Sequence, residues 1–463
     1  MRKLIFSLLL LSSMSLQAQF TGYNMVQVSR WDNDSLPGLG NQQYNSCWGW
    51  TDTSNGREYA ILGSIDSTYF FDITLAHKPV LCDVEPGRVR NAIWREYKTY
   101  GDYLYAACDQ AGSSMQIFDM RYLPDSVHKV YDEDSVISRS HTLWVDGNRL
   151  YANSCVDGKN GTMHAVSVFS LVNPEVPEYI GSIVPPIFSG QPAFTKCHDA
   201  FVRGDTLYCS GEIPGVFIYD VSNMNKPVLM GTIQDYPERG YNHSGAVSGD
   251  GKTFVFTDEN AGLGIKAYDI TNFGDLTLKS VFRSHKDAVA HNPYFIGNRL
   301  FMSYYHDGVY VFDMDDPAKP RVIAWYDTYP QNGNGYGGFQ GCWQAFPDYP
   351  SGTVIASDMT NGLFVLRMDA TVSVDMPNQV KDFWLYPNPA TERFQIEFDI
   401  QQDEELELSL VTMQGAEVKT ELRSATSGRN SWDLNWSAGL QTGVYLLQLK
   451  GQNTHICKKL VVR

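Results

Sequence analysis

The sequence predicts an all-β protein: a seven-bladed β-propeller closed by its N-terminal strand, followed by a small immunoglobulin-like β-sandwich. Three observations predict this fold. A unit of short apolar runs and turn residues recurs seven times, at steps of about 45 to 55 residues. A strand-like run near the N-terminus resembles an outer strand that the last unit lacks. The final segment alternates apolar and polar residues between glycine turns, which is typical of an antiparallel sandwich.

The clearest copy of the repeated unit spans residues 291–320. Two apolar runs flank the Gly-Asn pair at 297–298, which predicts a hairpin. The Asp-Gly pair at 307–308 makes a second turn, and residues 309–312 form a third strand. One such unit cannot bury its own apolar faces, so we expect the copies to pack against one another.

Each copy can be aligned on the aromatic or imidazole residue that opens its first strand. The seven aligned residues are Trp48, Trp94, His141, His198, His243, His291 and Trp343. The seventh unit ends at Met368 without an outer strand, whereas residues 25–31 alternate as the other outer strands do. We therefore expect the N-terminal strand to pair with the seventh unit and remove its exposed edge.

The chain divides into four segments. Residues 1–19 have a basic start, a short apolar run and a small-residue exit, which predict a secretory signal peptide and no transmembrane segment. Residues 20–369 form the predicted propeller, 370–382 a linker, and 383–463 the sandwich. We expect an exported protein.

Composition excludes some classes of function. The formal net charge is -16, and such an acidic chain is a poor partner for nucleic acid, because phosphate binding relies on Lys and Arg. Charged residues make up only 19% of the chain, which argues against disorder. Seven of the 8 cysteines lie in the propeller segment without a CxxC pair, so small buried thiols are favoured over a zinc knuckle.

Four motifs mark the C-terminal segment: YPNPA at 386–390, MQG at 413–415, GVYLL at 443–447 and KKLVV at 458–462. With these motifs, residues 383–463 resemble the type A sorting domain of the type IX secretion system of Bacteroidetes. The resemblance implies passage through the outer-membrane machinery of that system. Such domains are usually removed, and the protein is then released or attached at the cell surface.

The repeats resemble the choice-of-anchor B family, whose members carry LVIVD-type propeller repeats. The resemblance rests on CWGWTD at 47–52, GREYA at 56–60, FDIT at 71–74, WRE at 94–96 and the histidine-bearing units that follow. It implies the propeller fold and a surface location. It implies no particular activity, because members of this family share the repeats and differ in their anchors.

Antiparallel pairing predicts where polar side chains meet. The first strand of a unit starts on the face where the second strand ends, and first strands line the axis of a propeller. We therefore expect the four histidines of the aligned set to converge at one mouth of the channel, near the acidic residues that follow second strands. These acidic residues are Asp66, Asp109, Asp157, Glu212, Asp258 or Glu259, Asp307 and Asp358.

This mouth has three interpretations. The histidines are either repeated packing elements, ligands of a divalent metal ion, or the lining of a small-ligand pocket without metal. In the metal interpretation the ligands come from His141, His198, His243 and His291, with Glu212 and Asp307 as weaker candidates. Imidazoles favour zinc, whereas carboxylates would suit calcium.

Aromatic and basic side chains supply candidate contacts for a glycan or protein ligand: Trp48, Trp94, Arg95, Trp343 and Tyr336. Neither GxSxG nor HExxH is present, and the sequence assigns no catalytic residue. We therefore favour a secreted or cell-surface binding or scaffold protein over an enzyme. The rival hypothesis is a metal-dependent hydrolase or lyase that acts at the histidine-lined mouth.

Overall fold

The computed structural model describes residues 20–332, 335–368, 380–388, 390–391, 393–400, 402–412, 417–441, 443–451 and 455–462. The predicted signal peptide, 1–19, lies outside the described residues, as do positions 370–379 of the predicted linker. The chain forms two compact units, Met1–Arg367 and Met368–Arg463. Each is considered by itself below.

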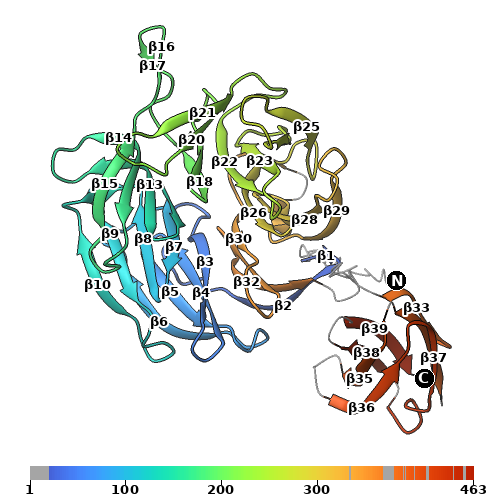
Figure 1. Ribbon diagram of the computed structural model, residues 1–463. Coiled ribbons are helices and arrows are strands. Elements are labelled where there is room, and N and C mark those ends of the chain that lie inside the picture. The colour runs from blue at the N-terminus through green and yellow to red at the C-terminus, as the bar shows by residue number, and fades with distance from the viewer. Residues whose placement is uncertain are drawn as a thin grey trace, which may run out of the picture. The chain divides into compact units, whose positions relative to one another are not determined.

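The described part of the first unit is built from antiparallel sheets of four or five strands, arranged around a common centre (Figure 1). In the first three sheets the strands follow in chain order from the innermost strand outward. They are β3 (Tyr44–Asp52), β4 (Arg57–Ser64), β5 (Ser67–Asp72) and β6 (Val80–Pro86); β7 (Arg95–Tyr100), β8 (Tyr103–Cys108), β9 (Met115–Asp119) and β10 (His128–Glu133); and β12 (Thr142–Asp146), β13 (Arg149–Asp157), β14 (Met163–Ser170) and β15 (Glu178–Ile183).

The next three sheets repeat this order. They are β18 (Asp199–Arg203), β19 (Thr206–Ser210), β20 (Val216–Asp220) and β21 (Val228–Ile233); β22 (Asn242–Val247), β23 (Thr253–Asp258), β24 (Ile265–Asp269) and β25 (Thr277–Phe282); and β26 (Ala290–Ile296), β27 (Arg299–Tyr304), β28 (Gly308–Asp313) and β29 (Arg321–Tyr326). A further sheet contains β30 (Cys342–Phe346), β31 (Thr353–Asp358) and β32 (Gly362–Met368).

The innermost strands contact one another in succession. β3 contacts β7, β7 contacts β12, and the series continues through β18, β22, β26 and β30; β30 also contacts β3. The first strands therefore surround one axis. Residues near their starting ends lie close together, although they are far apart in the sequence.

The N-terminal segment pairs with the later sheets of this unit. β2 (Met25–Trp31) is hydrogen-bonded to β32, and β1 (Gly22–Tyr23) pairs with β29. The Nε of Arg30 donates to the carbonyl oxygen of Asn361 at 2.7 Å. The ring of Trp31 packs against Tyr69 and Phe71, with centroids 5.4 and 4.8 Å away. Side-chain contacts thus add to the backbone pairing of β2.

The turn between the second and third strands requires glycine in the clearest unit. Gly308 has φ of +78°, a conformation that side chains with a Cβ rarely adopt, and an added Cβ would lie 2.2 Å from the carbonyl oxygen of Tyr326. The Asp-Gly pair read from the sequence therefore specifies both the turn and the close approach of β29.

Short elements in three places were not expected from the sequence. β11 (Ile137–Arg139) adds a strand to the sheet of β13. The long connector after β15 contains a hairpin of β16 (Ile187–Phe188) and β17 (Gln191–Pro192), and the connector after β29 contains the 3-10 helix η1 (Pro330–Asn332). All three lie where the regular repeat is interrupted.

The described part of the second unit holds two antiparallel sheets that share one apolar core. The alternating positions 394, 396, 398 and 400 of one sheet and 406, 408 and 410 of the other are buried. Within the predicted sorting motif, the Oδ1 of Asn388 accepts a hydrogen bond from the backbone N–H of Val461 at 2.8 Å. The strands are β33 (Val380–Tyr386), β34 (Phe394–Ile400) and β37 (Gly428–Leu434) in one sheet, and β36 (Glu417–Ala425), β35 (Glu404–Thr412), β38 (Gly443–Lys450) and β39 (His455–Val462) in the other.

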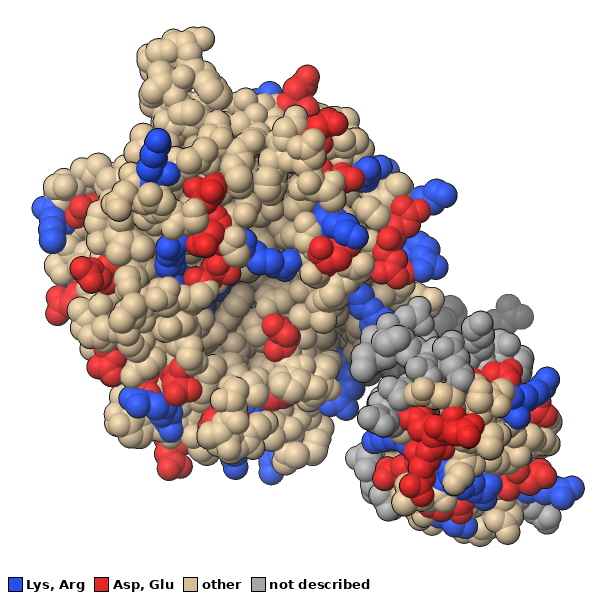
Figure 2. All heavy atoms as spheres, in the orientation of Figure 1, with Lys and Arg blue, Asp and Glu red and all other residues tan. Residues whose placement is uncertain are grey.

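The described residues contain no helix with the length and apolar character that a membrane span requires. Figure 2 shows acidic and basic side chains interspersed over the face of the first unit in view. The seven cysteines of this unit are free thiols, and all but the partly buried Cys82 are buried. Their burial favours a packing role.

Candidate metal centre

The four histidines lie at the starting ends of four successive innermost strands. His141 and His198 immediately precede β12 and β18, and His243 and His291 are the second residues of β22 and β26. Their rings follow one another in a row. The centroids are 4.2 Å apart for His141 and His198, 4.1 Å for His198 and His243, and 4.4 Å for His243 and His291. The structure therefore brings these residues together in one cluster.

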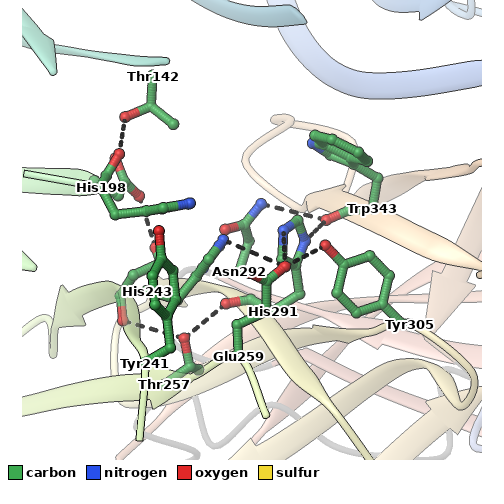
Figure 3. Close-up of polar contacts among 12 residues, drawn as sticks. Thr142, His198, Tyr241, His243, Thr257, Glu259, His291, Asn292, Tyr305 and Trp343 are labelled. Atoms are coloured by element: carbon green, nitrogen blue, oxygen red, sulfur yellow. Dashed lines mark hydrogen bonds and ion pairs between the residues drawn. The ribbon is translucent and has the colours of Figure 1, made fainter. Parts of the chain in front are cut away.

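Glu259 supplies the carboxylate of this cluster. It directly follows β23, the second strand of the sheet that carries His243. Its Oε1 lies 3.8 Å from the Nε2 atoms of both His243 and His291, and it accepts a hydrogen bond from the hydroxyl of Tyr305 at 2.6 Å. Figure 3 shows His243, His291 and Tyr305 directed toward this carboxylate.

Three of these side chains have the spacing of a metal site. One ligand atom from each of His198, His243 and Glu259 lies within 4.8 Å of the other two. Tetrahedral zinc holds its ligand atoms about 3.3 Å apart, so binding requires side-chain shifts on the order of 1 Å. Zinc sites with an open position commonly use three protein ligands, and two imidazoles with one carboxylate is one such set.

Burial keeps the imidazoles of His198, His243 and His291 neutral. It lowers the pKa of His198 and His243 well below the ordinary value, and it lowers the pKa of His291 to about 3. A neutral imidazole keeps a lone pair on one ring nitrogen, which is the form that binds metals. Burial also raises the pKa of Glu259, against the hydrogen bond from Tyr305. A bound cation would offset this cost of burying the carboxylate.

Hydrogen bonds determine which nitrogen of His291 carries the proton. Its Nδ1 lies 2.5 Å from the carbonyl oxygen of Trp343. Because a carbonyl only accepts hydrogen bonds, Nδ1 is protonated, and the lone pair of neutral His291 is on Nε2, the atom that faces Glu259. The Nδ1 atoms of His198 and His243 are buried and make no hydrogen bond of good geometry among the described residues, but weaker backbone hydrogen bonds of these rings with His243 and His291, respectively, raise their pKa against the effect of burial.

The two weaker acidic candidates lie outside the cluster. Glu212 accepts a hydrogen bond from Tyr241 at 2.9 Å, and the ring of Tyr241 is 5.4 Å from that of His198. Glu212 therefore reaches the histidines only through the side chain of Tyr241. Asp307 accepts hydrogen bonds from Ser284 at 2.6 Å and Tyr336 at 2.7 Å. Both contacts stabilise the loop around Asp307.

The tryptophans of the aligned set occupy three different environments. Trp343 belongs to the cluster: its carbonyl accepts from His291, and its Nε1 donates to Glu96 at 3.2 Å. Trp94 precedes β7 and is 45% exposed. Trp48 is the fifth residue of β3, and Lys98 Nζ lies 4.0 Å from the centroid of its ring. The alignment of Trp48 with the start of a strand was wrong, because β3 begins at Tyr44.

The other two ligand candidates make local contacts. Arg95 is buried and donates to the carbonyl oxygens of Ile65 and Val89, so it stabilises the loop before β7. The ring of Tyr336 stacks on His285 with centroids 4.8 Å apart. Neither residue contacts the histidine cluster among the interactions of the described residues.

Two members of the cluster were not assigned to the site from the sequence. Glu259 was only an alternative to Asp258, although the alternation of side chains along a strand allows one of two consecutive residues to face the axis. Tyr305 directly follows β27, as Glu259 follows β23, and this shared position is a signal that could have identified it.

Comparison with known proteins supports the assignment of the C-terminal unit. Residues 384–463 match the family model of a secretion system C-terminal sorting domain, which confirms the predicted sorting domain and indicates that the chain is exported. No match to the chain was found among curated proteins. The resemblance of the repeats to the choice-of-anchor B family stays a prediction.

Two solved structures are similar to the chain at low sequence identity. PorZ of Porphyromonas gingivalis, described as an essential bacterial surface component of the type-IX secretion system, aligns with a TM-score of 0.47 and 10% identity over 93% of this chain and 61% of its own. The β-propeller domain of Myceliophteria thermophila Cps50 (Swd1) aligns with a TM-score of 0.46 and 12% identity over 70% of this chain and 98% of its own. Because both TM-scores are below 0.5, we base the fold on the sheet topology given above.

Proposed function

We propose that this protein is an exported β-propeller that binds a divalent transition-metal ion, of the zinc type, at the histidine-lined end of its axis. The observation that carries the proposal is the spacing of His198, His243 and Glu259, whose ligand atoms lie within 4.8 Å of one another. Two imidazoles and a carboxylate suit zinc, whereas calcium requires six to eight oxygen ligands.

We also infer that the first unit is a closed seven-bladed ring that spans the predicted segment 20–369. The succession of innermost strands from β3 to β30, and the contact of β30 with β3, support this inference. The pairing of β2 with β32 supports closure by the N-terminal strand. For the second unit, two sheets around one core are consistent with an immunoglobulin-like sandwich.

Export places this binding site outside the cell. The match of residues 384–463 to a sorting domain supports secretion, and the motifs of this domain favour the type IX system. A signal peptide at 1–19 would take the chain across the inner membrane, and the sorting domain would direct it through the outer-membrane machinery. The protein then acts as a secreted or surface-attached binding protein.

Metal content tests the proposed function. The purified protein is stripped with a chelator, loaded with zinc, passed through a desalting column and measured by elemental mass spectrometry. We expect about one zinc ion per chain, and almost none after the double substitution His198→Ala and His243→Ala, because two of three ligands are then lost. His306→Ala is the matched control, since His306 is equally buried but lies beside Tyr329 and Tyr336. A wild-type protein that cannot be loaded would refute the metal site.

A metal-dependent hydrolase or lyase is the second candidate, because three protein ligands leave a coordination position for a substrate. Zinc-loaded protein would be tested with model carboxylic and phosphate esters, alongside the His198→Ala, His243→Ala protein. Turnover that depends on both zinc and the histidines would support the enzyme. Stoichiometric zinc without turnover of these esters would favour the binding protein.

A further inference from the structure

We propose that the hairpin of β16 and β17 is a membrane-contact element, whose apolar tip inserts into the interfacial layer of a lipid bilayer. The apolar tip consists of Val184, Ile187 and Phe188. The inference does not depend on the metal site proposed above. It assigns a role to a connector that interrupts the regular repeat of the propeller unit.

The hairpin stands out from the sheets of the propeller unit (Figure 1). It belongs to the connector between β15 and β18. The side chains of its apolar tip are exposed, to 77% for Val184, 62% for Ile187 and 44% for Phe188. Apolar side chains that gather on one exposed element are typical of a contact with a partner or with a membrane.

The connector carries no charged side chain between Glu178 and Lys196, whereas charged residues make up 19% of the whole chain. Accordingly, Figure 2 shows no acidic or basic side chain on the protruding hairpin in the face in view. Moving a charged side chain into the apolar part of a bilayer is costly. A hairpin without charge avoids this cost, so its tip can leave water.

The backbone of the hairpin also suits an apolar medium, in which each N–H requires an acceptor within the protein. Pro185, Pro186 and Pro192 have no N–H. The N–H of Ala193 donates to the carbonyl oxygen of Pro186 at 2.7 Å, and β16 pairs with β17. The hairpin therefore has fewer backbone donors that lose a water partner than an ordinary loop of the same length.

The turn and the base of the hairpin hold the apolar tip in place. Ser189 and Gly190 at the turn both have positive φ, +52° and +82°, as a type I′ turn between two paired strands requires. At the base, Phe194 is 2% exposed and packs on Phe217 of β20, with ring centroids 4.5 Å apart. Because the tip is ordered in advance, little conformational entropy is lost on binding.

The small size of the apolar tip favours a lipid surface over a protein partner. A stable protein interface takes about 20 to 30 residues from each side, far more than the tip offers. Shallow insertion into the interfacial layer needs only a few large apolar side chains, and aromatic rings are favoured there. The match of the C-terminal unit to a sorting domain indicates that the chain is exported, and at a cell surface the tip meets lipid.

Flotation of the purified full chain with phosphatidylcholine vesicles tests the proposal. We expect the wild type to float with the vesicles, and the bound fraction to fall about tenfold in the Ile187→Asp, Phe188→Asp protein, because carboxylates resist insertion. The matched control is Val172→Asp, Val176→Asp, which should float like the wild type: these residues are 77% and 58% exposed but lie before β15. Because the tip has no charge, flotation should persist at about 0.5 M salt.

Phe188→Trp gives a second readout, because brominated phosphatidylcholine should quench the fluorescence that this variant adds to that of the wild type. A wild type that does not float, or that floats only with anionic lipid and is released by salt, would overturn the membrane contact. Equal flotation of the wild type and the Ile187→Asp, Phe188→Asp protein would overturn the role of the tip. Self-association of the wild type without lipid that this double variant loses, measured by light scattering, would assign the tip to a second copy of the chain and overturn the proposal as well.

Discussion

Asp258 and Glu259 are consecutive carboxylates with different roles. The Oδ2 of Asp258 lies 2.5 Å from the Nζ of Lys266, and both side chains are fully buried. Asp258 also accepts hydrogen bonds from Tyr236 at 2.9 Å and from the backbone N–H of Gly240 at 3.1 Å. A buried ion pair requires such additional partners to offset its desolvation. Asp258 therefore stabilises its own sheet and, through Tyr236 and Gly240, the loop before His243, while Glu259 faces the histidines.

Asp358 is a structural carboxylate at the end of β31. Its oxygens accept hydrogen bonds from Thr328 Oγ1 at 2.8 Å and from the backbone N–H groups of Thr360 at 3.0 Å and Asn361 at 2.8 Å. It is fully buried, and burial raises its pKa to about 7, more than these hydrogen bonds and Arg30 of β2 lower it. Asp358 thus stabilises a turn and does not line the mouth.

The raised pKa of Asp358 predicts a pH-dependent effect of Asp358→Asn. Between the unfolded pKa near 3.9 and the folded value of about 7, the folded state retains a proton that the unfolded state releases, so this group lowers stability as pH rises. The amide side chain of the substituted protein stays neutral over this pH range, so its contribution to stability does not change with pH. We expect the stability of Asp358→Asn relative to wild type to rise by about 2 to 3 kcal/mol between pH 5 and pH 8.

Urea unfolding of both proteins at pH 5, 6, 7 and 8 checks this prediction. The informative quantity is the sign of the change with pH in the stability difference between the two proteins. A stability difference that is constant over the series, or that favours the wild type increasingly at high pH, would contradict a raised pKa and would indicate that Asp358 is ionised in the folded protein throughout this range.

Strand β2 pairs with the last strand of the sheet that contains β30, β31 and β32. Its backbone is hydrogen-bonded to β32, and Arg30 is held by Asn361 O at 2.7 Å, by Asp32, and by the ring of Phe364, whose centroid is 5.5 Å from the guanidinium carbon. Strands that close an array remove exposed edges, which otherwise pair with other chains. The stability of the unit should therefore depend on these contacts.

Arg30→Ala is expected to lower the free energy of unfolding of the propeller unit by about 1 to 3 kcal/mol, because it removes a partly buried, charge-assisted hydrogen bond. Arg321→Ala is the matched control: Arg321 of β29 pairs with Asp313 of β28, but its side chain is 75% exposed, so its loss should cost less than about 1 kcal/mol. Denaturant unfolding, followed by tryptophan fluorescence, compares the two. Equal losses would contradict a special role for β2.

The third strands and the Asp-Gly turn could be read from the sequence because each is specified locally, by an apolar run or by turn chemistry. The position of Trp48 could not be read in this way, because the repeats were aligned by residue type and the register of the strands was unknown. The register of β3 and β4 shifts between Tyr44 and Cys47, and β22, β26 and β30 have the same irregularity near their starts. His243, His291 and Trp343 lie within it, whereas in β3 this position is taken by Asn45 and Ser46, and Trp48 lies beyond it.

The candidate site was predictable only in part, because the repeat specifies some of its residues and contacts between sheets specify the others. Repetition identified the four histidines and the face on which they lie. The choice of Glu259 over Glu212 and Asp307 depends on which side chains contact one another across sheets. Those contacts join residues far apart in the chain, such as Asp109 with His141 and His291 with Trp343. The spacing of residues along the sequence does not predict these contacts.

Because the chain forms two compact units, we expect each to have its own role, and this predicts the effect of removing residues 383–463. The propeller unit has its own apolar cores and contains every residue of the histidine cluster, so we expect the truncated chain to fold and to bind zinc at the proposed site. Because it lacks the sorting domain, it should accumulate in the periplasm of a bacterium with a type IX system, whereas the full chain reaches the surface or the medium.

Fractionation and immunoblotting of cells that express the full or the truncated chain measure this distribution. An unrelated periplasmic reporter fused to residues 383–463 is the positive control and should move to the surface or the medium. A truncated chain that binds zinc and stays in the periplasm would show that export depends on the second unit and metal binding on the first. Surface delivery of the truncated chain at the level of the full chain would contradict the sorting role, because the export signal would then lie within the propeller unit.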